Sequence, residues 1–221
     1  MPRVDIPHTC YHIISRSVSL VDLFRDNSDF RIYLARLQRV KQESDFKVLC
    51  YCLMSTHVHL CLETGDGCKL SKIMHRLNTY YAGYYNAKYS INGPIFRNRY
   101  QSIFVDKDSY LLRLSRYIHL NPVSAGIVSF PDDYKWSSFK CYIDRSLGDG
   151  LIDLQSIAGY FTSPAEYNRF VVSGIRTPDD PFKEVICNNY MGSRQFVANI
   201  NRRLCMLGLR WQHLSGPSPF I

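Results

Sequence analysis

His57 and His59 are two histidines separated by one residue, at the start of the alternating segment His-Val-His-Leu-Cys-Leu-Glu. A period of two is typical of a strand that has one face in the core. Side chains two residues apart on a strand project the same way, so both imidazoles could hold one metal ion. Such a pair is more often a surface or packing feature than a pair of ligands. A metal site therefore needs at least one further ligand from elsewhere in the chain.

A predicted helix over residues 109–122 carries groups that would complete such a site. Tyr117 and Asn121 lie one turn apart on its polar face, next to an apolar face of leucine and isoleucine. If the polar face lies over the histidine strand, a hydroxyl and an amide oxygen meet the two imidazoles. A tyrosine in a helix usually packs, and Asn121 before Pro122 usually marks the end of a helix. These two residues alone therefore do not predict catalysis.

Four segments in a fixed order resemble the single-tyrosine HUH transposases, and most closely the REP-associated tyrosine transposase branch. They are His57-Val58-His59, Arg97–Ser102, Tyr117–Gly126 and Asp133–Ser138. The resemblance runs from Tyr11 to about Tyr142. No single segment is specific, and the order of the four carries the match. Members of this family often have Pro-Asn before the histidine pair, where this chain has Ser55-Thr56.

The resemblance implies that Tyr117 attacks a DNA phosphodiester and forms a 5′-phosphotyrosine intermediate with a free 3′ hydroxyl. It also implies Mg²⁺ or Mn²⁺ at His57 and His59. The one-turn offset from Tyr117 makes Asn121 our candidate for the third ligand. Such an ion would polarise the scissile phosphate and offset the developing negative charge. A phenol with a pKa of about 10 is a poor nucleophile at neutral pH, and the sequence identifies no secure group that would activate it.

The overall charge favours a polyanionic partner, because 27 Lys and Arg oppose 19 Asp and Glu for a formal charge of +8. Nucleic acid and an anionic membrane surface both fit, although many basic proteins bind neither. No apolar run approaches the roughly 20 residues of a membrane span, and the N-terminus has no signal-peptide core. The 8 cysteines form no Cys-x-x-Cys pair, which indicates reduced thiols. We therefore expect a cytoplasmic protein that is nucleoid-associated when bound to DNA.

The periodicities indicate an α+β fold: a ferredoxin-like antiparallel sheet of four or five strands with helices packed on it. Strands are predicted at 8–16, 46–54, 56–63 and 102–105, and helices at 27–44, 70–86 and 109–122. Asn27 or Ser28 can cap the first helix, without a capping box because Arg31 occupies the third position. A polar, glycine-rich stretch at 145–150 predicts a transposase/nuclease domain at 1–145. A helical C-terminal extension would then occupy 146–221, with helices near 154–160, 164–174 and 193–207.

Candidate DNA-binding residues fall into three groups: Arg16 at the end of the first strand, Lys72 and Arg76 on the second helix, and Lys88, Arg97, Arg99 and Tyr100 around a turn at 92–94. Basic side chains donate to phosphates, and aromatic faces stack on splayed bases. A core helix with exposed basic residues, or a solvated basic hairpin, would give the same pattern. His12 on the first strand, which the resemblance places beside the histidine strand, could lie near the site, but such a residue is more often a satisfied histidine than a ligand.

These observations favour metal-dependent cleavage and strand transfer of single-stranded or hairpin DNA by a monomer or homodimer. Two alternatives stay open. One is a hairpin-binding protein without turnover, in which the basic loops matter and Tyr117 does not. The other is a relative that acts on RNA, since such sheets also bind RNA. A covalent DNA adduct that depends on Tyr117 separates the first reading from both alternatives.

Overall fold

The computed structural model describes residues 5–18, 21–147, 150–177, 181–186 and 190–207. Four strands form the centre of its sheet: β1 (Cys10–Arg16), β2 (Phe46–Met54), β3 (His57–Thr64) and β4 (Gln101–Val105). Helix α1 (Asn27–Gln42) connects β1 to β2, and α2 (Leu70–Tyr89) connects β3 to β4. The spatial order begins β2-β3-β1-β4 and these neighbours are antiparallel. The predicted α+β, ferredoxin-like fold is confirmed.

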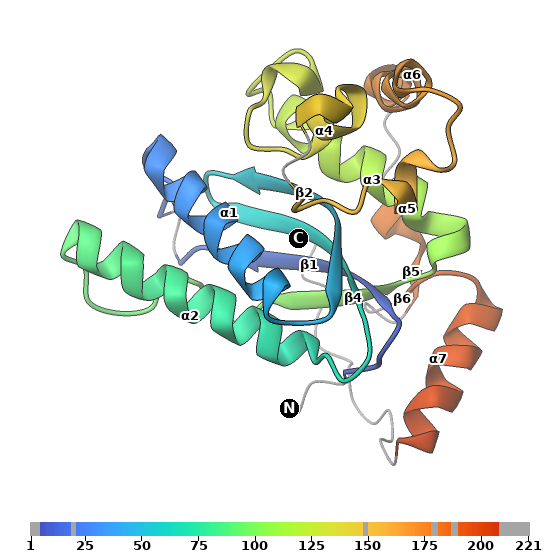
Figure 1. Cartoon of the computed structure of the whole chain (residues 1–221), viewed down its shortest axis with the longest axis horizontal. Coiled ribbons are helices and arrows are strands. Elements are labelled where there is room, and N and C mark those ends of the chain that lie inside the picture. The colour runs from blue at the N-terminus through green and yellow to red at the C-terminus, as the bar shows by residue number, and fades with distance from the viewer. Residues whose placement is uncertain (1–4, 19–20, 148–149, 178–180, 187–189, 208–221) are drawn as a thin grey trace.

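The two faces of the sheet are covered by different helices (Figure 1). Helices α1 and α2 lie side by side on one face, where they bury Val58, Leu60 and Leu62 of β3 in the first core. Helix α3 (Lys107–Ser124) covers the other face and shares a second core with Cys61. Because strand side chains alternate, His57 and His59 face α3. The predicted assignment of the two faces of this strand is therefore confirmed.

The sheet is larger than predicted, since two short strands extend it beyond β4. Strand β6 (Tyr190–Met191) runs parallel to β4 and pairs with Phe104 and Val105, and β5 (Val185–Ile186) pairs with β6. The described sheet thus has six strands, in place of the four or five expected, and one parallel pair. A two-residue strand spans only one repeat of the alternation, so periodicity cannot reveal it.

Two helix ends also differ from the prediction. Asp26 caps α1, and its side chain accepts from Ser28 N and Asp29 N while the Asp29 carboxylate accepts from Asp26 N. A capping box therefore forms, one position earlier than the two candidates considered. Helix α3 continues through Pro122 to its last residue, Ser124. Pro122 lies in the last turn, so the missing N–H removes only one bond near the end of the helix.

The C-terminal part folds against the same sheet and the same helix. It contains α5 (Gln155–Ala158), α6 (Pro164–Arg176) and α7 (Arg194–Met206), and the short α4 (Phe139–Ile143) precedes them. Short 3-10 helices lie before α4 at Pro131–Asp133, between α4 and α5 at Arg145–Leu147, and after α6 at Pro181–Glu184. Helix α6 packs on α3, and Tyr167 of α6 is buried in the second core. The boundary at residue 145 stays a prediction, and contacts of both cores cross it.

Two negative expectations concern the described residues. No helix in that part of the chain has the length and hydropathy needed to cross a membrane. The seven cysteines that it contains are all free thiols, and Cys10, Cys50, Cys52 and Cys61 are buried. Cys141 is half-buried.

Candidate active site

Helix α3 places the phenol of Tyr117 beside the histidine strand. The ring centroid of Tyr117 lies 5.9 Å from that of His59, with the two planes nearly perpendicular. The rings of His57 and His59 are 4.9 Å apart, also edge to face. Tyr117 is half-buried at the rim of the second core, which its neighbour Ile118 enters fully. The structure therefore brings the predicted nucleophile and both predicted imidazole ligands together.

Both imidazoles have a neighbour at Nδ1. The Nδ1 atom of His57 shares a hydrogen bond of 3.2 Å with Thr56 Oγ1. The Nδ1 atom of His59 shares one of 3.0 Å with His12 Nε2. Metal-binding histidines usually have their second ring nitrogen held in this way, which fixes the ring and the tautomer. The two Nε2 atoms are then the atoms left to face a cation.

Asn121 supplies an oxygen donor at the same place. Its Nδ2 donates to the Tyr117 carbonyl at 2.9 Å, one turn earlier in α3. Its side chain also lies near enough to His59 to act against the lowering of that imidazole's pKa. Because Nδ2 is engaged with the carbonyl, the amide oxygen is the atom left to serve as a ligand. Two nitrogens and one oxygen form a donor set for a divalent metal ion and leave coordination positions for a phosphate.

The third donor is an amide and not one of the His, Cys, Asp or Glu side chains that bind most metal ions. Among the residues that the structure describes, no three His, Cys, Asp or Glu side chains cluster closely enough to hold a metal ion. A three-ligand site at His57 and His59 therefore requires the amide oxygen of Asn121 as the third ligand.

Burial keeps the site histidines neutral. It lowers the pKa of His57 to about 4, with a further contribution from the nearby Arg16. Burial also lowers the pKa of His59 well below its usual value, and His12, His57 and Arg16 add to this effect. The pKa of the fully buried His12 falls to about 3 for the same reason of desolvation. Neutral imidazoles keep their lone pairs, so these residues can bind a metal at any physiological pH.

Arg16 supplies a positive charge at the open end of the site. It is the last residue of β1, lies directly across from His57 in the antiparallel register, and is exposed. Residues opposite each other in a register point to the same face. The guanidinium is therefore placed to meet a phosphate that approaches His57 and Tyr117.

His12 is the site residue that the sequence did not single out as functional. It lies on β1 across from Cys61, its ring is stacked on that of His59 at 5.2 Å, and it is fully buried. The ring of Tyr117 stands 6.5 Å away. The alternation of β1 was the available signal, but only the pairing of β1 with β3 shows which neighbour His12 meets. The structure makes it the residue that orients His59.

Replacing His12 with phenylalanine is expected to weaken Mn²⁺ binding by about 10- to 100-fold, because His59 loses the partner that fixes its ring. Isothermal titration of Mn²⁺ measures this change. His12→Gln is the matched control: its amide can still bond to His59 Nδ1, so part of the affinity should return. Equal Mn²⁺ affinity in the wild type and in His12→Phe would contradict the orienting role.

The predicted DNA-binding residues occupy different environments. Arg16, Lys72, Arg97 and Arg99 are exposed, Tyr100 is 7% exposed, Arg76 is ion-paired with Glu43, and Lys88 binds two carboxylates. The two carboxylates that Lys88 contacts are those of Asp26 and Asp29, each at 2.7 Å, and Asp29 is fully buried. The Lys88 ammonium therefore compensates a buried charge in the cap of α1.

Lys88→Met is expected to lower the melting temperature by several degrees, because it leaves the buried Asp29 carboxylate without its cation. Its effect on DNA affinity should be small at temperatures where the variant is folded. Arg97→Met is the matched comparison: this exposed residue should leave the melting temperature unchanged, weaken DNA binding and reduce the salt dependence of binding. Calorimetry and fluorescence anisotropy at several salt concentrations measure the two properties. The opposite pattern would make Lys88 a DNA contact.

Comparison with known proteins agrees with this fold. Residues 6–121, more than half of the chain, match the model of the family described as "Transposase IS200 like". The chain therefore belongs to the IS200-like transposase family, and the family predicted from the four sequence segments is confirmed. A search of curated proteins finds no match.

Two solved structures are similar to this chain. The first is a REP-associated tyrosine transposase bound to a REP hairpin, with a TM-score of 0.54 and 16% identity, covering 70% of this chain and 88% of that one. At this identity the likeness concerns the fold. The second is a transposase candidate from Deinococcus radiodurans R1, with a TM-score of 0.39 and 14% identity, covering 53% of this chain and 94% of that one.

Proposed function

We propose that the protein cleaves and rejoins single-stranded DNA through a covalent bond to Tyr117, with Mg²⁺ or Mn²⁺ at His57, His59 and Asn121. The observation that carries the proposal is the placement of the Tyr117 ring 5.9 Å from an imidazole whose Nδ1 is already held by His12. A packing tyrosine needs no neutral imidazoles with fixed rings beside it. The membership in a transposase family gives this geometry a reaction to perform.

Each side chain has a role in the proposed reaction. The Tyr117 oxygen attacks the phosphorus as the bond from phosphorus to the 3′ oxygen breaks, which leaves a 5′-phosphotyrosine and a 3′ hydroxyl. Arg16, exposed at the end of β1, binds a phosphate oxygen. The bound cation would polarise the phosphate and help to lower the pKa of the phenol. The reverse attack by a 3′ hydroxyl restores the free tyrosine and joins the strands.

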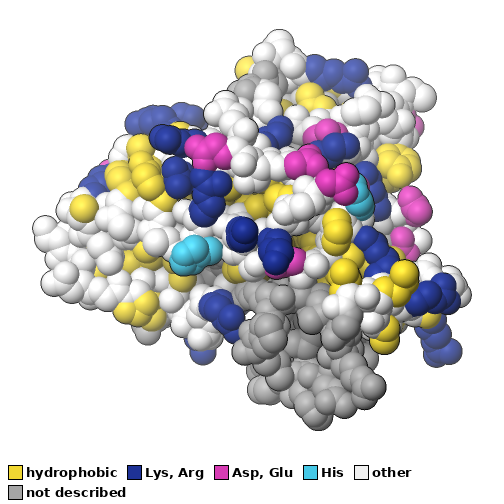
Figure 2. All heavy atoms as spheres, turned by 60° about the horizontal axis from the view of Figure 1, so that its bottom comes forward, with side chains coloured by type: hydrophobic (Ala, Val, Ile, Leu, Met, Phe, Trp, Pro, Cys, Tyr) yellow, Lys and Arg dark blue, Asp and Glu magenta, His cyan; other side chains and the backbone are white. Residues whose placement is uncertain are grey.

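The proposed substrate is DNA with a hairpin beside the cleaved strand, as in the REP-associated branch. The similar solved structure is described as bound to a REP hairpin, and this chain shares its fold. The formal charge of +8 favours such a polyanion. Figure 2 shows Lys and Arg side chains spread over the face that brings α2 and α7 forward.

A hairpin oligonucleotide tests the proposal. Its sequence comes from palindromic repeats that flank the coding region, and its 3′ end carries a fluorophore. Incubation with Mn²⁺ should give a labelled protein band that survives denaturation, and EDTA should prevent it. Tight binding without an adduct would indicate a hairpin-binding protein without turnover. An adduct with the RNA version alone would indicate the RNA-processing alternative.

A further inference from the structure

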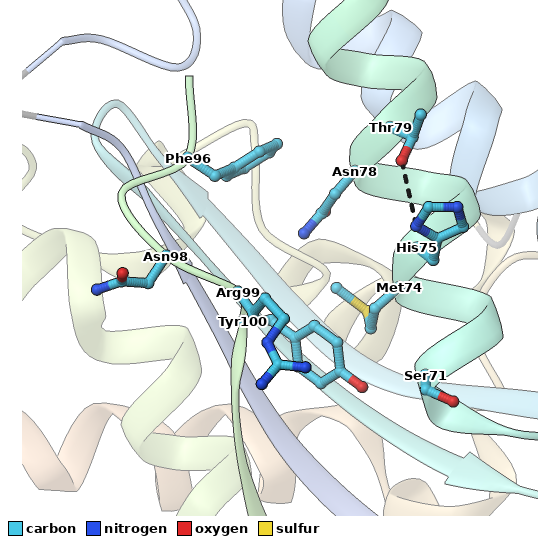
Figure 3. A pocket seen from close by; sticks show the side chains of 9 residues that line it. All are labelled: Ser71, Met74, His75, Asn78, Thr79, Phe96, Asn98, Arg99 and Tyr100. Carbon is cyan, nitrogen blue, oxygen red and sulfur yellow. Dashed lines mark hydrogen bonds between the residues drawn. The ribbon is translucent and has the colours of Figure 1, made fainter. Parts of the chain in front are cut away.

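A cavity of about 480 Å³ lies between α2 and the chain segment that leads into β4 (Figure 3). His75, Asn78 and Thr79 of α2 line one side, and Phe96, Arg99 and Tyr100 line the other. Packing of α2 on the first core places this cavity on the face of the sheet opposite Tyr117. It is therefore separate from the cluster around the histidine pair.

The cavity and the histidine pair nevertheless lie at the same end of the sheet. Phe96 forms a bridge with Ser17, and Arg97 N donates to the carbonyl of Arg16 at 2.9 Å. Asn78 Nδ2 donates to Ser15 Oγ at 3.4 Å on the cavity side, whereas Arg16 lies beside His57 on the other. Ser15 and Arg16 at the end of β1, with Ser17 directly after it, thus separate the two places.

One edge of the sheet connects the two faces. Among the described residues, strand β6 pairs with β4 at Phe104 and Val105 and not along the Gln101–Ile103 part of that edge. A single strand of DNA that has one phosphate at Tyr117 can pass over this edge. Arg97 and Arg99 are exposed along that path and can bind its phosphates.

The lining of the cavity combines the two features that hold a nucleobase. Phe96 is half-buried, and its ring is supported from behind by Tyr81 at a centroid distance of 6.4 Å. Aromatic faces stack on bases of any sequence. Across the cavity, Asn78 carries an amide that can bond to a base edge, and the hydroxyl of its neighbour Thr79 shares a hydrogen bond of 3.5 Å with His75 Nδ1 (Figure 3). The volume lies in the usual range of roughly 300–1,000 Å³ for small-ligand sites.

We propose that this cavity holds one unpaired nucleobase of the DNA strand that is bound at Tyr117, a few nucleotides away from the cleaved phosphate. The proposal rests on the proposed function and adds a second point of contact to it. Arg99 is the one lysine or arginine side chain among the lining residues, all of which the structure describes. A free nucleotide with several phosphates needs more positive charge than that, so a base within a strand fits better.

Fluorescence of 2-aminopurine tests this site without any cleavage. The probe is the hexanucleotide d(A)6 with one central 2-aminopurine, added in EDTA to the Tyr117→Phe protein. Stacking on Phe96 should quench the fluorescence. Phe96→Leu in the same background should weaken binding about tenfold and remove most of the quenching, because one stacked base is lost.

Two further variants keep the test independent of folding defects. Thr79→Phe adds a ring at an exposed position of α2 and should block the cavity, with the same loss of quenching as Phe96→Leu. Asn92→Ala changes an exposed residue of the turn before the cavity and should leave binding unchanged. Quenching that is equal in Tyr117→Phe alone and with Phe96→Leu or Thr79→Phe added would overturn the proposal.

Competition decides between the possible occupants. Deoxyadenosine monophosphate that displaces the hexanucleotide at equal concentration would show a free-nucleotide site and overturn the proposal, as would r(A)6 that binds more tightly than d(A)6. Quenching that depends on Phe96, together with no covalent adduct in the hairpin assay, would retain this site and reject cleavage. A covalent adduct together with quenching that does not depend on Phe96 would retain cleavage and reject this site.

Discussion

Tyr117→Phe should abolish the covalent DNA adduct and lower strand cleavage by at least about 10³-fold, since a phenyl ring has no oxygen to bond to phosphorus. The ring itself keeps its edge-to-face contacts with His59 and His12. The melting temperature and the affinity for the uncleaved hairpin should therefore stay close to those of the wild type. A denaturing gel of the labelled hairpin, calorimetry and anisotropy measure the three properties.

Tyr110→Phe is the matched control for this substitution. Tyr110 lies two turns earlier on the same helix, is also half-buried, and has the Arg113 guanidinium 5.3 Å from its ring centroid. Its hydroxyl is remote from the histidine pair in the sequence of the helix, so adduct formation should persist. An adduct that survives in Tyr117→Phe and maps by mass spectrometry to another residue would reject Tyr117 as the nucleophile.

Acidification should unfold the protein at about pH 5, because the buried histidines take up protons only when the chain is unfolded. Burial lowers the pKa of His12 and His119 to about 3 and that of His57 to about 4. The unfolded chain binds these protons below about pH 6.5, and the folded chain does not. Their stabilising effect is therefore present above pH 6.5 and is lost as the pH falls toward the folded values. Each group lowers the unfolding free energy by about 1.4 kcal/mol per pH unit in this window.

Urea unfolding measured from pH 7.5 to 5 tests the slope, and His119→Gln tests its origin. His119 is held between Tyr167 Oη at 2.7 Å and Ser138 Oγ at 2.8 Å in the second core. The variant should be less stable at pH 7.5. Its unfolding free energy should fall less steeply with decreasing pH, by the slope that corresponds to about one proton taken up on unfolding. His75→Gln changes an exposed ring and should leave the slope unchanged. If the unfolding free energy of His119→Gln fell with pH as steeply as that of the wild type, a group other than His119 would cause the acid sensitivity.

Local sequence patterns were sufficient for the central sheet and for the helix faces. The predicted strand at 46–54 coincides with β2, and the alternation after Thr56 correctly separated Val58 and Leu60 from the histidines. The polar stripe of the 109–122 helix likewise placed Tyr117 and Asn121 on one side, where the structure finds them beside His59. These features depend on neighbours within one or two turns, or within one strand.

Features that depend on residues far apart in the chain were missed. The sequence placed His12 near the site, but its contact with His59 spans 47 positions, and only the register of β1 with β3 reveals that contact. The ion pairs of Lys88 with Asp26 and Asp29 join residues about 60 positions apart, so the sequence did not show them, and the role of Lys88 in DNA binding stays a prediction. Asp29 was overlooked as the acidic member of a capping box for a different reason. The cap was sought at Asn27 or Ser28, and a shift of one or two positions moves the matching acid out of place.

Tyr167 and β6 set a limit on how the chain can be shortened. Tyr167 fills the second core beside α3, and β6 covers the end of β4 at Phe104 and Val105. A recombinant fragment that stops at residue 145 would expose this apolar surface together with an unpaired backbone edge, a combination that promotes aggregation. Soluble material for crystallisation or labelling should therefore retain the sequence through Met206, the last residue of α7.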